Sequence, residues 1–168
     1  MAATTTAKKQ YQKANTQSIL SLLTPIQLLQ RSHGIFAALH LQIPIYLLDQ
    51  PALTQPILAQ LQPQVILTDP LGLQKLYQNL PSYLGDPAIT SKAFEKAQTI
   101  INKREEAIAQ GKKDPALNRM RYRLNNQKLY NKVQAKLGGK IQYFWLDSGP
   151  IAEETKHFFE ECALKLIQ

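Results

Sequence analysis

The chain of 168 residues contains a single cysteine, Cys162. One cysteine cannot form a disulfide within the chain, nor the cysteine cage of a structural zinc site. No apolar run approaches the length of a membrane span. Residues 1–11 are polar and lack the apolar stretch of a secretory signal. We therefore expect a protein of a reducing compartment, the cytoplasm.

The common constellations of catalytic and metal-binding residues are also missing from the sequence. It contains no G-x-x-x-x-G-K-[ST] or G-x-G-x-x-G phosphate loop and no G-x-S-x-G nucleophile elbow. His33 and His40 are seven residues apart and can share a helix face, but no third metal ligand accompanies them. Cys162 has no adjacent cation, which favours a packed thiol over an activated one. The sequence thus predicts no metal site and no cofactor.

What the chain does have is a concentration of positive charge. Its formal net charge is +8, and residues 92–140 alone hold thirteen basic and four acidic side chains, a net of +9. Such a segment is typical of a contact surface for phosphates, anionic lipid or an acidic protein, although a solvated helical face gives the same pattern. Tyrosines among the cations also allow nucleic-acid binding, which is the weaker alternative. The candidates for binding a partner or phosphates are Lys112, Lys113, Arg119, Arg121, Arg123, Lys128, Lys132 and Lys136.

Short apolar runs alternate along the chain with segments of helical periodicity, which is typical of parallel βαβ units. The sequence therefore predicts an α/β fold. We expect a three-layer, mostly parallel sheet of about five strands, with a long helical insertion at about residues 90–138 between strands three and four. We interpret residues 1–15 as a flexible tail and residues 16–168 as one domain. The expected strands are 19–23, 43–48, 65–68, 141–146 and 164–167, and the expected helices include 27–41, one beginning at Gln50-Pro51, 70–80 and 150–162.

Two stretches carry a family resemblance. Residues 20–31 and the Ile45-Tyr46 pair that follows are similar to an L-S-I-L-P-x-W-H-S-x-E-R segment and its next strand, and residues 62–77 resemble K-P-x-x-M-V-x-V-P followed by R-L-W-E-x-I-Y. Residues 130–141 are similar to a K-[IV]-x-x-x-x-G-G-x-[IL] run, and residues 151–159 match L-x-x-x-x-x-x-F-F. In this order and spacing they resemble the long-chain acyl-CoA synthetases of the adenylate-forming (AMP-binding) superfamily. The helical part between them is similar to a shortened insertion of the cyanobacterial and plastid branch.

The chain departs from that family at the positions that handle phosphate. Residues 1–17, where the family has its T-S-G-T-T-G-x-P-K-G loop, contain no glycine. The family's Y-G-x-T-E motif and its C-terminal lobe with the catalytic lysine are not in the printed sequence. Neutral residues replace charged motif positions, and the S-G-G-x-P-L loop has become Leu-Asp-Ser-Gly-Pro-Ile at residues 146–151. The charged positions now read Gln27, Gln30, Leu71 and Gln74.

Adenylation requires donors, Mg²⁺ and cations placed in advance around the transferring phosphates. The resemblance, together with these losses, implies a non-catalytic acyl-CoA-synthetase-like protein. We expect it to bind another protein, as a subunit or an assembly or regulatory factor of a larger complex. A second hypothesis is that the protein binds an acyl or adenine-nucleotide ligand in a remnant pocket. A third is that its basic surface binds an anionic membrane or nucleic acid. The branch resemblance makes a photosynthetic membrane the candidate surface. The remnant-pocket candidates are Gln27, Arg31, Trp145, Asp147, Ser148 and Gly149.

Overall fold

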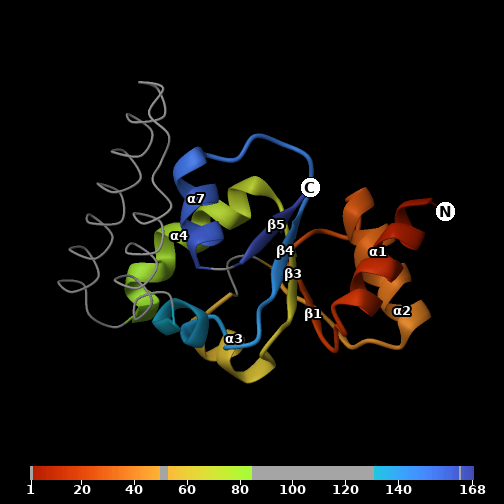
Figure 1. Cartoon of the computed structure of the whole chain (residues 1–168), viewed down its shortest axis with the longest axis horizontal. Coiled ribbons are helices and arrows are strands. Elements are labelled where there is room, and N and C mark those ends of the chain that lie inside the picture. Colours follow the sequence, from red (N-terminus) through yellow and green to blue (C-terminus); the bar gives the residue numbers. More distant parts are fainter. Residues whose placement is uncertain (1, 50–52, 85–130, 163) are drawn as a thin grey trace, which may run out of the picture.

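A computed structural model describes residues 2–49, 53–84, 131–162 and 164–168. Five parallel strands form one sheet in the order β2-β1-β3-β4-β5 (Figure 1). This confirms the α/β fold and the parallel sheet that the sequence predicts. The strands are β1 (Ile19–Ser21), β2 (Ile45–Leu47), β3 (Val65–Thr68), β4 (Tyr143–Leu146) and β5 (Lys165–Ile167). The helices are α1 (Ala2–Lys13), η1 (Gln30–Phe36), α2 (Ala37–Leu41), α3 (Gln55–Leu61), α4 (Pro70–Leu84) and α7 (Glu153–Glu161), and residues 131–136 are helical as well.

The three-layer arrangement follows from the side chains of the central strands. All four residues of β3 and all four of β4 are buried. Successive side chains of a strand point to opposite faces of the sheet. Val65 and Leu67 of β3 accordingly join one apolar cluster, and Ile66 joins the other. A sheet that is apolar on both faces needs a layer of helices on each.

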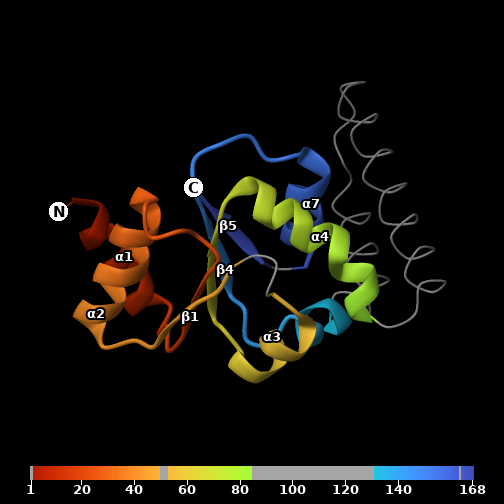
Figure 2. The same cartoon turned by 180° about the vertical axis from the view of Figure 1, so that it is seen from behind.

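Each face of the sheet is covered by a different group of helices. In Figures 1 and 2, α1 and α2 lie on one side of the sheet and α3, α4 and α7 on the other. The first group contributes Ala7, Tyr11, Ala37 and Ala38 to the smaller cluster. The larger cluster, on the other face, contains Leu58 of α3, Leu73 and Leu80 of α4, and Phe158 of α7.

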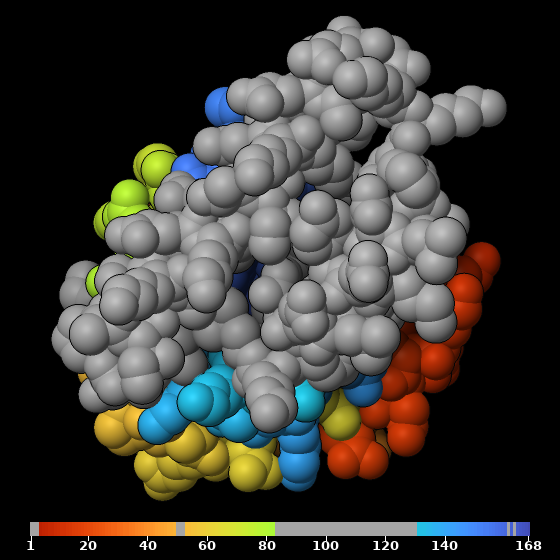
Figure 3. All heavy atoms as spheres, turned by 60° about the vertical axis from the view of Figure 1, so that its left-hand side comes forward, coloured from red at the N-terminus to blue at the C-terminus, as the bar shows by residue number. Residues whose placement is uncertain are grey.

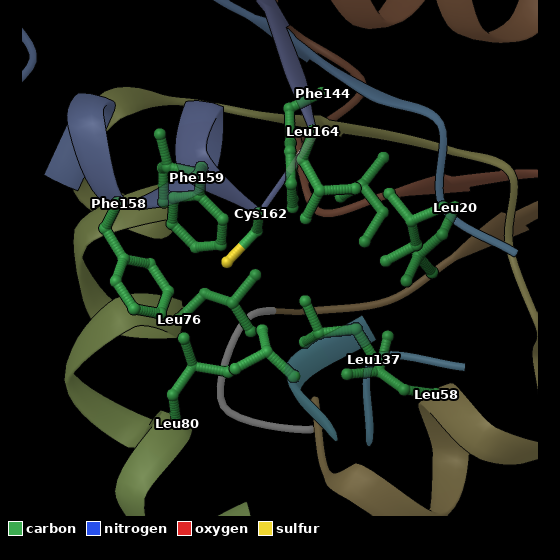
Figure 4. Packing of buried hydrophobic residues seen from close by; sticks show 14 of the residues in the cluster. Leu20, Leu58, Leu76, Leu80, Leu137, Phe144, Phe158, Phe159, Cys162 and Leu164 are labelled. Carbon is green, nitrogen blue, oxygen red and sulfur yellow. The ribbon is translucent and has the colours of Figure 1, made fainter. Parts of the chain in front are cut away.

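The single cysteine belongs to the larger cluster. Figure 4 shows the Cys162 thiol among Leu76, Phe159 and Leu164. Cys162 is buried, as the packed-thiol interpretation of the sequence predicts.

The N-terminal segment is a packed helix, and the prediction of a flexible tail at residues 1–15 is wrong. Ala7 and Tyr11 are four residues apart, so they share one face of α1, and both are buried in the smaller cluster. The Tyr11 hydroxyl also donates a hydrogen bond of 2.7 Å to the His33 carbonyl oxygen of η1. The polar composition of residues 1–15 did not predict this helix, because α1 covers its face of the sheet with only a narrow apolar stripe.

The connection between β1 and β2 differs in detail from the predicted helix 27–41. Its first part, η1, is a π-helix, and α2 continues it. Short π-helical segments occur often at functional sites. The predicted strand 43–48 shortens to β2, and Pro44 lies just before it on the edge of the sheet, where its missing N–H costs no ladder bond. The helix expected from Gln50-Pro51 begins instead at Gln55.

The helical residues 131–136 end at the glycine pair that the sequence marks as a helix cap. Gly138 has a φ of 102°, and its N–H donates to the Ala135 carbonyl. A Cβ on Gly138 would lie 2.6 Å from the Leu58 carbonyl oxygen of α3, so glycine permits this close approach. Figure 3 shows α3 in yellow beside these cyan residues. The predicted insertion at 90–138 lies outside the described residues except for this last part.

Candidate functional site

The loops that follow β1, β3 and β4 meet at the carboxyl end of the parallel sheet. The order of strands changes direction between β1 and β3, because β2 lies on one side of β1 and the later strands on the other. In open α/β sheets, ligands bind outside the carboxyl ends of the strands near such a switch point. This end of the sheet is therefore the natural place for a site.

A pocket of about 510 Å³ opens beside the carboxyl end of β4. Its volume lies within the range of small-molecule sites, about 300–1,000 Å³. Four residues that the sequence nominates come together here, namely Trp145, Asp147, Ser148 and Gly149. The remaining wall consists of Thr6, Leu29, His33, Leu146, Ile167 and Gln168.

The other two nominated residues lie outside this pocket. Gln27 supports its wall: the side-chain amide donates to Asp147 Oδ2 at 3.3 Å, and its own oxygen accepts from the Thr24 N–H at 2.7 Å. These bonds link the loop after β1 to the loop after β4. The Asp147 side chain also accepts from the Ser148 N–H at 2.9 Å. Arg31 is exposed on η1 and does not line the pocket.

His33 is a pocket residue that sequence reasoning did not nominate. The Ser32 hydroxyl donates its one proton to the Leu28 carbonyl oxygen at 2.8 Å. At the same time its oxygen lies 2.8 Å from His33 Nδ1. Ser32 must therefore accept from an Nδ1–H, which leaves the lone pair of the neutral imidazole on Nε2. Burial lowers the pKa of His33 and favours this neutral form.

An aromatic cluster surrounds Trp145, which lines the pocket together with His33. Its indole ring lies 4.3 Å from the His33 ring and 5.6 Å from the Tyr11 ring, measured between centroids. Tyr143 lies 6.2 Å away on the same strand, and burial raises the pKa of this phenol to about 12. Burial also raises the pKa of Tyr11. Both phenols are thus neutral at physiological pH, and they place no charge behind Trp145.

A second, smaller pocket of about 260 Å³ adjoins the first across Trp145. Both pockets share Thr6, Trp145 and Ile167. The second one adds Gln10 and the exposed lysines Lys9 and Lys13. Residues 6, 9, 10 and 13 form one stripe on α1, beside the stripe of Ala7 and Tyr11 that packs in the core. Neither lysine forms an ion pair with a described residue, so no carboxylate in the described part of the chain neutralises these two charges.

The residues of the metal and basic-surface predictions do not form a common site. His33 and His40 do not converge, because His33 is buried against Trp145 and the exposed His40 accepts from Lys8 Nζ at 2.6 Å. No cluster of three metal ligands occurs among the described residues. Of the basic candidates, Lys132 is exposed and Lys136 half-buried on helical residues 131–136. The other candidates lie outside the described residues: Lys112, Lys113, Arg119, Arg121, Arg123 and Lys128.

The described helices include none with both the length and the apolar composition that crossing a membrane requires. In comparisons with known proteins, no protein-family model, no curated protein and no solved structure matches this chain. The site is therefore interpreted from its own groups: hydrogen-bond acceptors at one end, an aromatic cluster, and cations at the other end.

Proposed function

We propose that this protein is a non-catalytic, acyl-CoA-synthetase-like domain that acts by binding another protein, as a subunit or an assembly or regulatory factor of a larger complex. The resemblance in sequence supplies the family, and the lost charges at Gln27, Gln30, Leu71 and Gln74 support the absence of adenylation chemistry. We further propose a cytoplasmic location at the periphery of a membrane. Residues 92–140 would supply the charge for that contact.

The observation that carries this proposal is a set of large apolar side chains left exposed between β1 and β2. Phe36 is 57% exposed and Leu39 is 69% exposed, and Leu28 before η1 is exposed as well. Their spacing of eight and three residues places them near one face of η1 and α2. Contiguous exposed apolar side chains on a small domain mark interaction sites. We call Leu28, Phe36 and Leu39 the apolar face.

The neighbouring strand offers backbone groups to the same partner. β2 is an edge strand. The Pro44 carbonyl accepts from the Ile19 N–H, and the Leu48 N–H donates to the Ser21 carbonyl. Ile45 and Leu47 therefore turn their own N–H and C=O groups away from β1. An edge of this kind can pair with a strand of another chain.

Affinity capture from the native host, at native expression level, tests this function. The paired substitution Phe36→Gln/Leu39→Gln should release the bound partner, because both side chains are exposed and their loss removes contact area rather than core packing. Leu71→Gln is the matched control, since Leu71 is 67% exposed on α4, on the other side of the sheet. Recovery of free monomer alone, or a partner retained by the paired variant, would contradict the proposal. ATP-dependent thioester formation by the purified protein would contradict its non-catalytic part.

Ligand binding at the carboxyl end of the sheet is a second candidate function. It is favoured by one observation, the convergence of Trp145, Asp147, Ser148 and Gly149 on a single pocket. Calorimetry with fatty acid, acyl-CoA, ATP and AMP tests the remnant-pocket form of this function. The absence of heat with all four would remove that form.

A further inference from the structure

The two adjoining pockets around Trp145 have opposite polarity. Their shared walls are Thr6, Trp145 and Ile167. One end presents hydrogen-bond acceptors, and the other presents two lysines that have no ion-pair partner among the described residues. A ligand that fills both pockets must therefore carry groups of opposite character at its two ends.

The acceptor end is formed by His33 and Asp147. The Nε2 lone pair of His33 has no hydrogen-bond partner among the described residues, and His33 lines the pocket. Each Asp147 oxygen accepts one hydrogen bond, from Gln27 or from the Ser148 N–H, and a carboxylate oxygen can accept a second. No cation is among the residues that line this pocket. A ligand group that contacts His33 Nε2 and the Asp147 carboxylate must donate hydrogen bonds to them, and a positive charge is favoured beside a carboxylate and an indole ring.

The cationic end is formed by Lys9 and Lys13, four residues apart on α1. The residues that line this pocket include no acidic side chain. An anionic ligand group is favoured here for the same electrostatic reason. Between the two ends, the Trp145 ring and the Ile167 side chain offer an apolar surface.

We propose that the joined pockets bind a small aminocarboxylate, with its ammonium group at His33 and Asp147, its carboxylate at Lys9 and Lys13, and its apolar body against Trp145 and Ile167. This inference rests on the second candidate function, ligand binding, and specifies a ligand class other than an acyl chain or a nucleotide. An acyl carboxylate would satisfy only the lysine end, and a nucleotide with its phosphates at the lysine end would bring no positive charge to Asp147.

Tryptophan fluorescence tests this directly, because Trp145 is the only tryptophan in the chain. The probes are 8-aminooctanoate, which carries both charges, and its two matched halves, octylamine and octanoate. We expect 8-aminooctanoate to shift the emission and to bind about tenfold or more tightly than either half, the effect of one charge-assisted hydrogen bond. Titration of 6-aminohexanoate, which is shorter by two methylene groups, tests whether the distance between the two ends of the joined pockets matters for binding.

Charge-removing variants assign the two ends. Asp147→Asn should weaken the binding of 8-aminooctanoate and octylamine about tenfold and leave the binding of octanoate unchanged. Lys9→Gln/Lys13→Gln should weaken the binding of 8-aminooctanoate and octanoate about tenfold and leave the binding of octylamine unchanged. Lys75→Gln, at an exposed position of α4, is the matched control and should change nothing. If octanoate or ATP binds as tightly as 8-aminooctanoate, ligand binding stands and the aminocarboxylate inference falls. If no probe shifts the emission of the wild-type protein, both fall. The comparison of probes on the wild-type protein holds even if a variant fails to fold.

Discussion

The Tyr11 hydroxyl donates a 2.7 Å hydrogen bond to the His33 carbonyl oxygen, and both residues are buried. This bond joins the N-terminal helix to the π-helical segment that lines the pocket. The order of α1 is therefore tied to the order of the site.

Substitutions of Tyr11 measure how much this contact contributes to the free energy of unfolding. Tyr11→Phe should lower the free energy of unfolding by about 1 kcal/mol, because it leaves a buried carbonyl oxygen without a donor. Tyr11→Ala should lower it by about 3–5 kcal/mol through the additional loss of buried ring area. Urea unfolding monitored by circular dichroism gives both values. If Tyr11→Ala has the stability of the wild-type protein, residues 1–15 do not pack on the domain and the prediction of a flexible tail is right.

Gly34 lies four residues after Gln30 on η1, close to the Gln30 side chain. A Cβ at position 34 would meet Gln30 Oε1 at 2.6 Å and Ile45 Cδ1 at 3.3 Å. Gly34→Ala should therefore displace the Gln30 amide from the Ser21 hydroxyl that donates to it and cost about 1–3 kcal/mol of stability. In a Gln30→Ala background the same change should cost less, because the obstructing oxygen is gone. Additive costs in the double-mutant cycle would show that the contact is not the cause.

Gly138 and Gly139 separate steric clash from backbone strain. Both have positive φ, but a Cβ on Gly138 would meet the Leu58 carbonyl oxygen whereas a Cβ on Gly139 would meet nothing within 4 Å. Gly139→Ala should cost about 1 kcal/mol, the penalty of the left-handed conformation alone. Gly138→Ala should cost at least about 1–2 kcal/mol more. Thermal or urea unfolding of the two single variants measures both losses of stability. Equal losses would mean that α3 moves away from the added Cβ at position 138 without cost.

Burial of His33 makes stability depend on pH. Because its folded pKa is lowered from 6.5, the unfolded chain binds more protons below that value, and stability rises with pH. The His33 contribution is fully present above pH 6.5 and is lost as the pH falls from 6.5 through the folded pKa. His33→Gln should flatten this slope between pH 7 and pH 5, while exposed His40→Gln should retain it. A slope unchanged in His33→Gln would assign the effect to other groups.

The central sheet could be predicted from the sequence because its strands are short apolar runs with clear ends. Val65–Thr68 is bounded by polar residues and by Asp69-Pro70, and its burial on both faces follows from a run without alternation. Helix α1 could not be predicted in the same way. Its buried stripe consists of Ala7 and Tyr11, a pattern too sparse to distinguish from a polar tail.

Half of the pocket could also be predicted from the sequence, because Trp145 to Gly149 are consecutive and span the end of a predicted strand. His33 could not be predicted as a pocket residue, because 112 positions separate it from Trp145. Only the parallel pairing of β1, β3 and β4 brings η1 close to the indole ring. The π-helical turn adds a further offset that α-helical periodicity does not anticipate. Arg31 was nominated from the resemblance, but this geometry leaves it exposed.

Photo-crosslinking in the native host tests the central claim most directly. A photoreactive amino acid placed singly at position 36, 39 or 71 samples the apolar face and the control surface on α4. We predict one protein adduct of the same mass from positions 36 and 39, and none of that mass from position 71. No adduct from either position of the apolar face, or the same adducts from all three positions, would contradict a protein that works by binding a partner through this face.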